Sequence, residues 1–274
     1  MLRALNSGVS GLQQFQGRMD VIGNNIANVN TIGFKSGRVD FAETFSQMIQ
    51  TGGDAGSQQV GMGVTTSAIT NQFTQGTLAS TGRETDLAIV GDDFFTVRDA
   101  RAGTEYLTRA GNFHLDTSGH LITSEGLRVQ GFADAGLSTR GDIQIDGTGS
   151  GAAAGATVKS FSIGNDGKIT VRMTDGTEFV RGQVLLQSVS APQMLVKEGN
   201  NLYSNIAAAG PLAAPGAPGT DGLGTIASQT LELSNVDLSA EFTSLITNQR
   251  AFQANARIVV TSDEVLQELV NLKR

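Results

Sequence analysis

The chain of 274 residues contains no cysteine and no tryptophan, and only two tyrosines, two histidines and four prolines. Without cysteine the protein has no disulfide, no thiolate metal site and no cysteine nucleophile. Phenylalanine supplies nearly all of the aromatic rings. So few aromatic platforms disfavour binding of carbohydrate or single-stranded nucleic acid, because that binding depends on stacking.

Positive charge is also scarce. Nineteen Lys and Arg residues stand against 26 Asp and Glu residues, which gives a net charge of −7. Nucleic acid and anionic lipid surfaces are bound through clustered Lys and Arg, so we expect neither nucleic-acid binding nor membrane insertion. No apolar run approaches the roughly 18 residues of a membrane span. Polar and Gly positions near the N-terminus also replace the apolar core of a secretory signal.

Catalytic and metal-binding motifs are missing. The sequence has none of the patterns GxSxG, HExxH, GxxxxGK[ST] and GxGxxG. We place His114 and His120 on a surface strand and just after its turn. Asp92 and Asp93 are interpreted as a turn, because adjacent carboxylates on a strand point to opposite faces. We therefore predict that the protein is not an enzyme and carries no metal or other cofactor.

Long helical stripes mark both ends of the chain. Apolar residues recur every seven positions from Leu5 and again from Leu238, which predicts one amphipathic helix over 2–30 and another over 235–272. We expect these stripes to carry self-assembly contacts. Their residues are Leu5, Leu12, Phe15, Met19, Ile22 and Ile26 at the front, and Leu238, Phe242, Leu245, Phe252, Val259 and Leu266 at the back.

Two interpretations of the stripes stay open at this point. A helical stripe most often packs on its own domain, but two terminal stripes of matching length can also pair with each other, knobs into holes. Such a pair leaves residues such as Ile246 and Val270 on its outer faces, and a long exposed apolar strip is usually an interface. That interface either closes into a dimer or bundle, or repeats head to tail into a helical filament.

The middle of the chain is predicted to be mainly β. Gly accounts for 35 residues, and apolar and polar residues alternate from about 64 to 204, as they do in strands. Asp-Gly pairs at 166–167 and 175–176 predict hairpin turns. The strand candidates are Leu87–Val90, Phe94–Arg98, Glu105–Arg109, Phe113–Asp116, Leu127–Phe132, Lys168–Met173 and Val184–Val189.

These patterns together predict an α+β fold. Residues 1–33 and 235–274 form a terminal helical module, paired like a coiled coil. Residues 34–75 form a connecting segment, in which the spacing of Phe41, Phe45 and Met48 predicts a short helix over 39–50, followed by a loop over 51–63. Residues 76–234 form a β-rich domain, which ends in a Gly/Pro/Ala-rich linker over 207–224.

Several segments resemble one known family. Residues 19–35, MDVIGNNIANVNTIGFK, are similar to the N-terminal signature of the bacterial flagellar rod and hook proteins. Residues 234–272 resemble the matching C-terminal module, and residues 75–91 and 108–113 resemble the middle of the family. The resemblance covers roughly the first 130 and the last 45 residues, in the family's order.

The resemblance implies a subunit of the axial tube between flagellar motor and filament. Family members place both terminal helices in the inner wall and β domains outside, and they polymerise helically around a channel. They leave the cell through the flagellar type III export apparatus, without a cleaved signal. The implied location is the hook or basal body, and the implied partners are other copies, neighbouring axial proteins of the rod and hook–filament junction, the hook cap and the export apparatus.

Phe41 and Phe45 resemble the short Phe-x-x-x-apolar pattern that the export gate reads in early substrates. The alternative is that they form the core of the short helix predicted over 39–50.

The sequence indicates less sharply which member of the family this chain resembles. Residues 236–242, 266–274 and 1–5 look most like the hook, and residues 51–60 are short for the insertion typical of distal rod proteins. Many hook proteins carry an extra outer domain and are longer. The hook is therefore the main interpretation and a distal rod or other rod subunit the alternative. A remote alternative is a secreted β-rich adhesin or binding module.

Overall fold

The computed structural model describes residues 2–50, 58–148, 156–211 and 214–272. The chain falls into two compact units. The helical unit comprises residues 1–29, 36–72 and 236–274, and the β unit comprises residues 30–35 and 73–235. Among the described residues, no helix is both long enough and apolar enough to cross a membrane.

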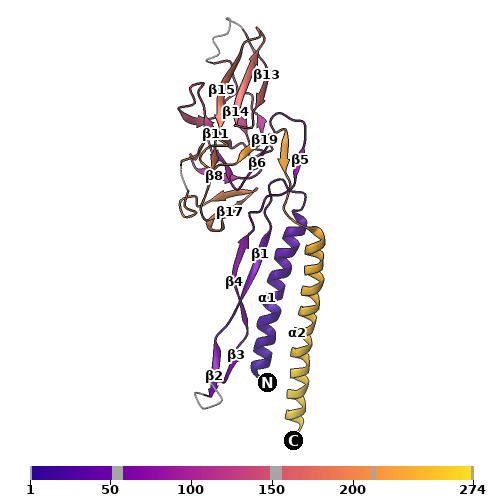
Figure 1. The fold of residues 1–274 in the computed structure, drawn as a ribbon. Coiled ribbons are helices and arrows are strands. Elements are labelled where there is room, and N and C mark those ends of the chain that lie inside the picture. The colour runs from indigo at the N-terminus through magenta and orange to yellow at the C-terminus, as the bar shows by residue number, and fades with distance from the viewer. Residues whose placement is uncertain (1, 51–57, 149–155, 212–213, 273–274) are drawn as a thin grey trace. The chain divides into compact units, whose positions relative to one another are not determined.

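Two antiparallel helices form the frame of the helical unit (Figure 1). They are α1, Leu2–Ala27, and α2, Leu238–Leu272, so both helices predicted at the ends of the sequence are confirmed to within three residues at each described end. Asp237 caps α2, because its Oδ1 accepts hydrogen bonds from the backbone N–H groups of Ser239 and Ala240 at 2.8 and 3.2 Å.

A long β-hairpin lies beside α1 in the same unit (Figure 1). Strand β1, Gly37–Glu43, pairs antiparallel with β4, Val64–Asn71, and β2, Ser46–Gln50, pairs with β3, Gln58–Gly61. The helix predicted over 39–50 is therefore wrong, as is the loop predicted over 51–63 where it overlaps β3; residues 51–57 lie outside the described residues. The spacing of Phe41 and Phe45 fits a helix locally, but pairing with the Thr-rich β4 determines the outcome.

One large antiparallel sheet dominates the β unit. Its main strand order is β13-β14-β15-β11-β7-β8-β18-β17, with β9, β10, β12 and β16 attached beside this path. Its strands are β7 Phe94–Arg98, β8 Glu105–Thr108, β9 His114–Leu115, β10 Leu121–Ile122, β11 Arg128–Phe132, β12 Arg140–Asp142, β13 Val158–Ile163, β14 Lys168–Met173, β15 Glu178–Val184, β16 Leu186–Gln187, β17 Val196–Gly199 and β18 Leu202–Ser204.

Two separate pairs of short strands complete the β unit. Strand β5, Leu78–Ser80, pairs with β20, Thr230–Glu232, and β6, Leu87–Val90, pairs with β19, Thr225–Ser228. A 3-10 turn, Pro192–Met194, precedes β17. Each strand predicted from the sequence overlaps at least one observed strand.

The predicted linker over 207–224 runs in turns that are bonded to the sheet. Gly216 exchanges two backbone hydrogen bonds of 2.9 Å with Leu186, and Ser190 N donates to Gly210 O at 3.0 Å. Residues 212–213 lie outside the described part of the chain.

The core of the β unit has two clusters on either side of β7. Phe95 and Val97 face the larger cluster, whereas Phe94 faces a smaller one with Leu107 and Tyr203. Successive side chains of a strand point to opposite faces, and here both faces are covered. The rings of Phe94 and Tyr203 meet edge to face at 5.9 Å between centroids.

Candidate functional site

The seam between α1 and α2 is narrow because two glycines face α2. A Cβ atom added at Gly11 would lie 2.7 Å from Nδ2 of Asn255, and one added at Gly8 would lie 3.1 Å from Cγ2 of Val259. Neither glycine is needed for a helix, which alanine would favour by about 1 kcal/mol. Their presence is explained by the close approach of the two helices.

Polar side chains set the register along this seam. Nδ2 of Asn25 donates to Oε1 of Glu241 at 2.9 Å, and Nδ2 of Asn248 donates to the carbonyl oxygen of Phe15 at 2.7 Å. Asn25 and Gly11 are 25 − 11 = 14 residues apart, and their partners Glu241 and Asn255 are 255 − 241 = 14 apart. Both helices therefore advance by two heptads between these contacts, as an antiparallel pair in one register requires.

Asn25 also fastens the hairpin to the helices. The side chain is buried, its Nδ2 donates to Gly37 O at 2.9 Å, and its Oδ1 accepts from Gly37 N at 2.9 Å. Two more contacts hold the hairpin along α1: the rings of Phe15 and Phe41 meet edge to face at 6.4 Å, and Val64 N donates to Oγ of Ser10 at 3.4 Å. One amide thus joins α1, β1 and α2.

The twelve stripe residues predicted from the sequence fall into three classes of exposure. Ile22 is buried in the seam, whereas Leu238 and Phe242 are exposed. The other nine are half-buried: Leu5, Leu12, Phe15, Met19, Ile26, Leu245, Phe252, Val259 and Leu266. Most stripe residues are therefore at least partly covered, whereas part of α2 faces outward. The role of the stripe residues in self-assembly remains a prediction.

Sequence reasoning missed the polar and glycine half of the seam. Gly8, Gly11, Asn25 and Asn248 are all buried. A signal was present, because Glu241, Asn248, Asn255 and Ser262 recur every seven residues in phase with the apolar stripe. Oδ1 of Asn248 has no hydrogen-bond partner among the described residues.

The two residues of the predicted export motif lie in different surroundings. Phe41 lies in β1 and packs on Phe15, whereas Phe45 follows β1 and is 90% exposed. The alternative that both form a short-helix core is wrong, since no helix is present there. Recognition of this pair by an export gate remains a prediction.

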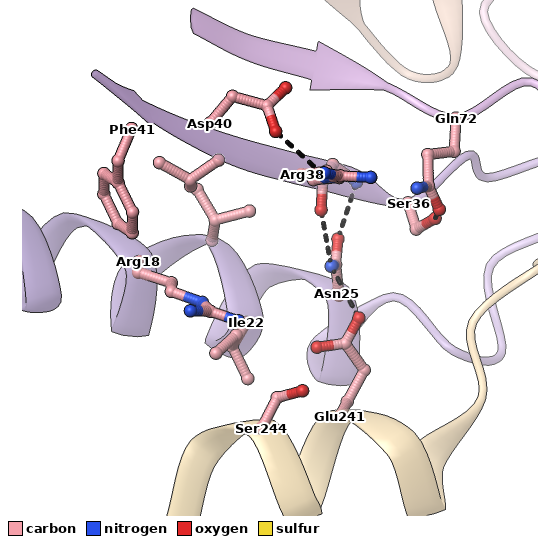
Figure 2. Close-up of a pocket in the computed structure, with 13 residues that line it drawn as sticks. Arg18, Ile22, Asn25, Ser36, Arg38, Asp40, Phe41, Gln72, Glu241 and Ser244 are labelled. Carbon is pink, nitrogen blue, oxygen red and sulfur yellow. Dashed lines mark hydrogen bonds and ion pairs between the residues drawn. The ribbon is translucent and has the colours of Figure 1, made fainter. Parts of the chain in front are cut away.

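A groove opens between α1, β1 and α2 (Figure 2). Its volume is about 570 Å³, and its lining includes Val21, Val39, Phe41 and Ser244 besides buried Ile22.

The groove also holds charge. Nε of Arg38 pairs with Asp40 at 3.0 Å, and Glu241 accepts from Asn25. Arg18 is exposed and has no ion-pair partner among the described residues. One cation in the groove is thus available to an outside group.

Helix α2 presents apolar side chains to solvent along its length. Exposed residues occur near its start, at Leu238, Phe242 and Ile246, and near its end, at Val265, Leu269 and Leu272. Since Gly8 lies against Val259, the antiparallel register places Leu2 opposite residue 259 + 6 = 265. Helix α2 therefore continues about two turns past Leu2, and Leu272 is 79% exposed.

A buried charge cluster holds the β unit together. Nζ of Lys35 lies 2.6 Å from Oε1 of Glu232, and Nη1 of Arg109 lies 3.4 Å from Oε2, all with fully buried side chains. Burial lowers the pKa of Lys35 and of Arg109, and the Glu232 carboxylate opposes both shifts. Lys35, Arg109 and Glu232 come from distant parts of the sequence, so their ion pairs link three segments of the β unit. We call this cluster the clasp.

Other polar residues form no converging set. His114 lies in β9 and His120 pairs across an isolated bridge with Gln144. Asp93 accepts a hydrogen bond from Gly224 N at 2.6 Å. The described residues contain no group of three His, Cys, Asp or Glu residues that could hold a metal ion. The candidate site is therefore the contact surface of the helix pair, α1 and α2.

Replacing Asn25 by Ala should loosen the helical unit. The change removes three hydrogen bonds and leaves Gly37 N–H and C=O without their partner, which predicts a loss of about 2–3 kcal/mol. Hydrogen exchange of the α1 and β1 backbone amides measures this loss of stability. Asn24→Ala is the matched control, because Asn24 is exposed, and it should cost no more than about 0.5 kcal/mol. Equal losses in both variants would contradict this assignment.

Comparison with known proteins gives three family matches along the chain. Residues 5–35 match the model described as flagella basal body rod protein, residues 88–171 the flagellar hook protein FlgE/F/G D1 domain, and residues 227–272 the flagellar basal body rod FlgEFG protein C-terminal region.

Whole proteins of similar sequence carry two kinds of name. The flagellar basal-body rod protein FlgG of Bacillus subtilis is 44% identical over 281 aligned residues, covering 100% of both chains. The FlgG protein of Borreliella burgdorferi is 33% identical, again with 100% of both chains covered. The flagellar hook protein FlgE of Treponema pallidum is 45% identical over 140 residues, which cover 48% of this chain and 30% of that protein.

Proposed function

The chain belongs to the family of bacterial flagellar rod and hook proteins, and from this premise we propose that it is a subunit of the distal rod. Proteins of this family are structural and polymerise into the axial structure of the flagellum. The observation that carries the choice of rod is the end-to-end match to a basal-body rod protein at 44% identity.

The hook, which was the main interpretation of the sequence, is less well supported than its alternative. The Treponema hook protein matches only about half of this chain. The hook protein of Borreliella burgdorferi is matched over 100% of both chains, but at only 26% identity over an alignment of 444 residues. The terminal segments favoured the hook, but the model that matches the C-terminal segment, residues 227–272, is named for FlgE, FlgF and FlgG together. Such segments do not discriminate between hook and rod. The secreted adhesin has no support in the matches described above.

The helical unit supports a role in polymer contacts. Its seam is closed by glycines and asparagines, which leaves apolar residues of α2 facing outward, as a subunit that packs against its copies requires. We infer a protein without enzymatic activity whose partners are its own copies and the adjoining axial proteins. We also infer passage through the flagellar type III apparatus without a cleaved signal, with Phe41 and Phe45 as the candidate export motif.

Electron microscopy of a deletion strain tests the proposal. Cells without this chain should build basal bodies that stop before the distal rod, with neither hook nor filament, and the wild-type gene should restore all three. Purified protein should form straight tubes. Curved tubes, or a deletion strain that keeps a complete rod and lacks only the hook, would return the assignment to the hook.

A further inference from the structure

We propose that the C-terminal end of α2 in one copy docks into the groove between α1, β1 and α2 of the next copy. The inference rests on the proposed function, because it assumes that the chain polymerises. It adds the two surfaces that meet and the ion pair that orients them.

The two surfaces lie at opposite ends of one helix. Glu241 and Ser244 line the groove near the start of α2, whereas Leu269 and Leu272 are exposed at its end. Glu241 and Leu269 are 269 − 241 = 28 residues apart, and Ser244 and Leu272 are 272 − 244 = 28 residues apart. At 1.5 Å per residue the surfaces are separated by roughly 42 Å along the helix. Joining them displaces each copy by about that distance along α2.

Contact between two different surfaces of one chain produces an open polymer. A self-complementary patch closes into a dimer, but a heterologous contact repeats and, unless the rotation closes a ring, extends into a filament. By the register of the pair, the end of α2 reaches about two turns beyond Leu2. Within one chain it cannot bend back to the groove, because both belong to the same straight helix (Figure 1).

The two surfaces are complementary in chemistry. Val265, Leu269 and Leu272 are spaced i, i+4 and i+7 and form an exposed apolar stripe, which matches Val39 and Phe41 on the groove wall. Glu268 lies at the edge of this stripe, three residues after Val265 and four before Leu272.

Charge orients the contact. From residue 258 to 272, α2 carries three carboxylates, Asp263, Glu264 and Glu268, and no basic residue, and Lys273 and Arg274 follow in the sequence. The groove offers Arg18, which has no ion-pair partner among the residues that the structure describes (Figure 2). Opposite charges across an interface set its register, and like charges placed there oppose binding. We pair Glu268 of one copy with Arg18 of the next.

Charge exchange in the full-length chain tests the pairing. Arg18→Glu and Glu268→Arg should each raise the critical concentration for polymerisation about tenfold or more, whereas the double variant should return it to within about threefold of wild type. Sedimentation and electron microscopy measure this. Asp20→Lys is the control, because Asp20 is exposed on α1 and lies outside the groove; it should polymerise normally. Single variants that polymerise like wild type, or a double variant that is no better than either, overturn the inference.

Cysteine cross-linking gives a second test that does not depend on the charges. Because the chain has no cysteine, Val39→Cys in one copy and Leu269→Cys in another provide the only thiols in a mixed polymer. Disulfides should join the two variants in the polymer and not in dilute monomer. Cross-linking of Leu269→Cys chains to each other, or none in a polymer that forms normally, overturns the inference. If the wild-type chain forms no polymer, the proposed function itself fails.

Discussion

Replacing Glu232 by Ala should unfold the β unit under mild conditions, with a loss of about 3–5 kcal/mol in the free energy of unfolding. Oε1 of Glu232 accepts from Lys35 Nζ at 2.6 Å and from Gly76 N at 2.8 Å, and Oε2 faces Arg109. Without the carboxylate two fully buried cations lose the anion that pairs them. Urea unfolding of the monomer, followed by tyrosine fluorescence, measures the change, because Tyr203 is buried beside this cluster.

The control for this prediction is an exposed ion pair in the same unit. Glu178 lies 3.3 Å from Arg172, and both side chains are more than half exposed. Glu178→Ala should therefore change stability by no more than about 1 kcal/mol. Glu232→Gln separates charge from shape, because it keeps the size of the side chain and removes only the negative charge. If Glu232→Ala costs no more than Glu178→Ala, the clasp does not hold the unit.

Elements determined by short-range pattern could be predicted from the sequence. The apolar seven-residue repeats define both helices, because helix periodicity is a local property. The Asp-Gly turns are also local, and Gly167 and Gly176 do adopt positive φ angles of 75° and 89°, as a tight hairpin turn requires.

Elements determined by partners far away in the sequence could not be predicted. The pairing of β1 with β4 places Gly37 opposite Asn71, and no local window contains both strands. The clasp joins residues 35, 109 and 232, none of which differs locally from an ordinary surface charge. Only the fold shows that their side chains are buried.

The candidate site was predicted only in its apolar half. A stripe of Leu, Phe and Ile in the sequence predicts an interface, whereas asparagines usually indicate surface positions. In the structure, Asn248 donates a hydrogen bond across the seam and Asn255 faces Gly11. Polar residues at core positions of paired helices specify register at some cost in stability. Which apolar residues turn outward thus depends on where the polar layers and glycines lie.

Substituting Asp for both Phe242 and Ile246 should prevent polymerisation while leaving the subunit folded. The two side chains are 50% and 57% exposed, so they contribute little to the fold. In a polymer, full burial of an apolar side chain is worth about 1.5–3 kcal/mol. Losing two half-burials and adding two charges should raise the critical concentration at least about 100-fold, as measured by sedimentation.

The matched control places the same charges on the same turns of α2. Thr243 and Thr247 are exposed and are also four residues apart, so Thr243→Asp with Thr247→Asp adds equal charge without removing apolar surface. This variant should polymerise far better than the Phe242 and Ile246 variant, with both keeping wild-type helix content by circular dichroism. Equal loss in the two would show that charge on α2, and not its apolar face, prevents assembly. A chain lacking residues 238–274 is the limiting case, since it removes the outward face together with the seam; tubes formed by that chain would rule out α2 as an assembly element.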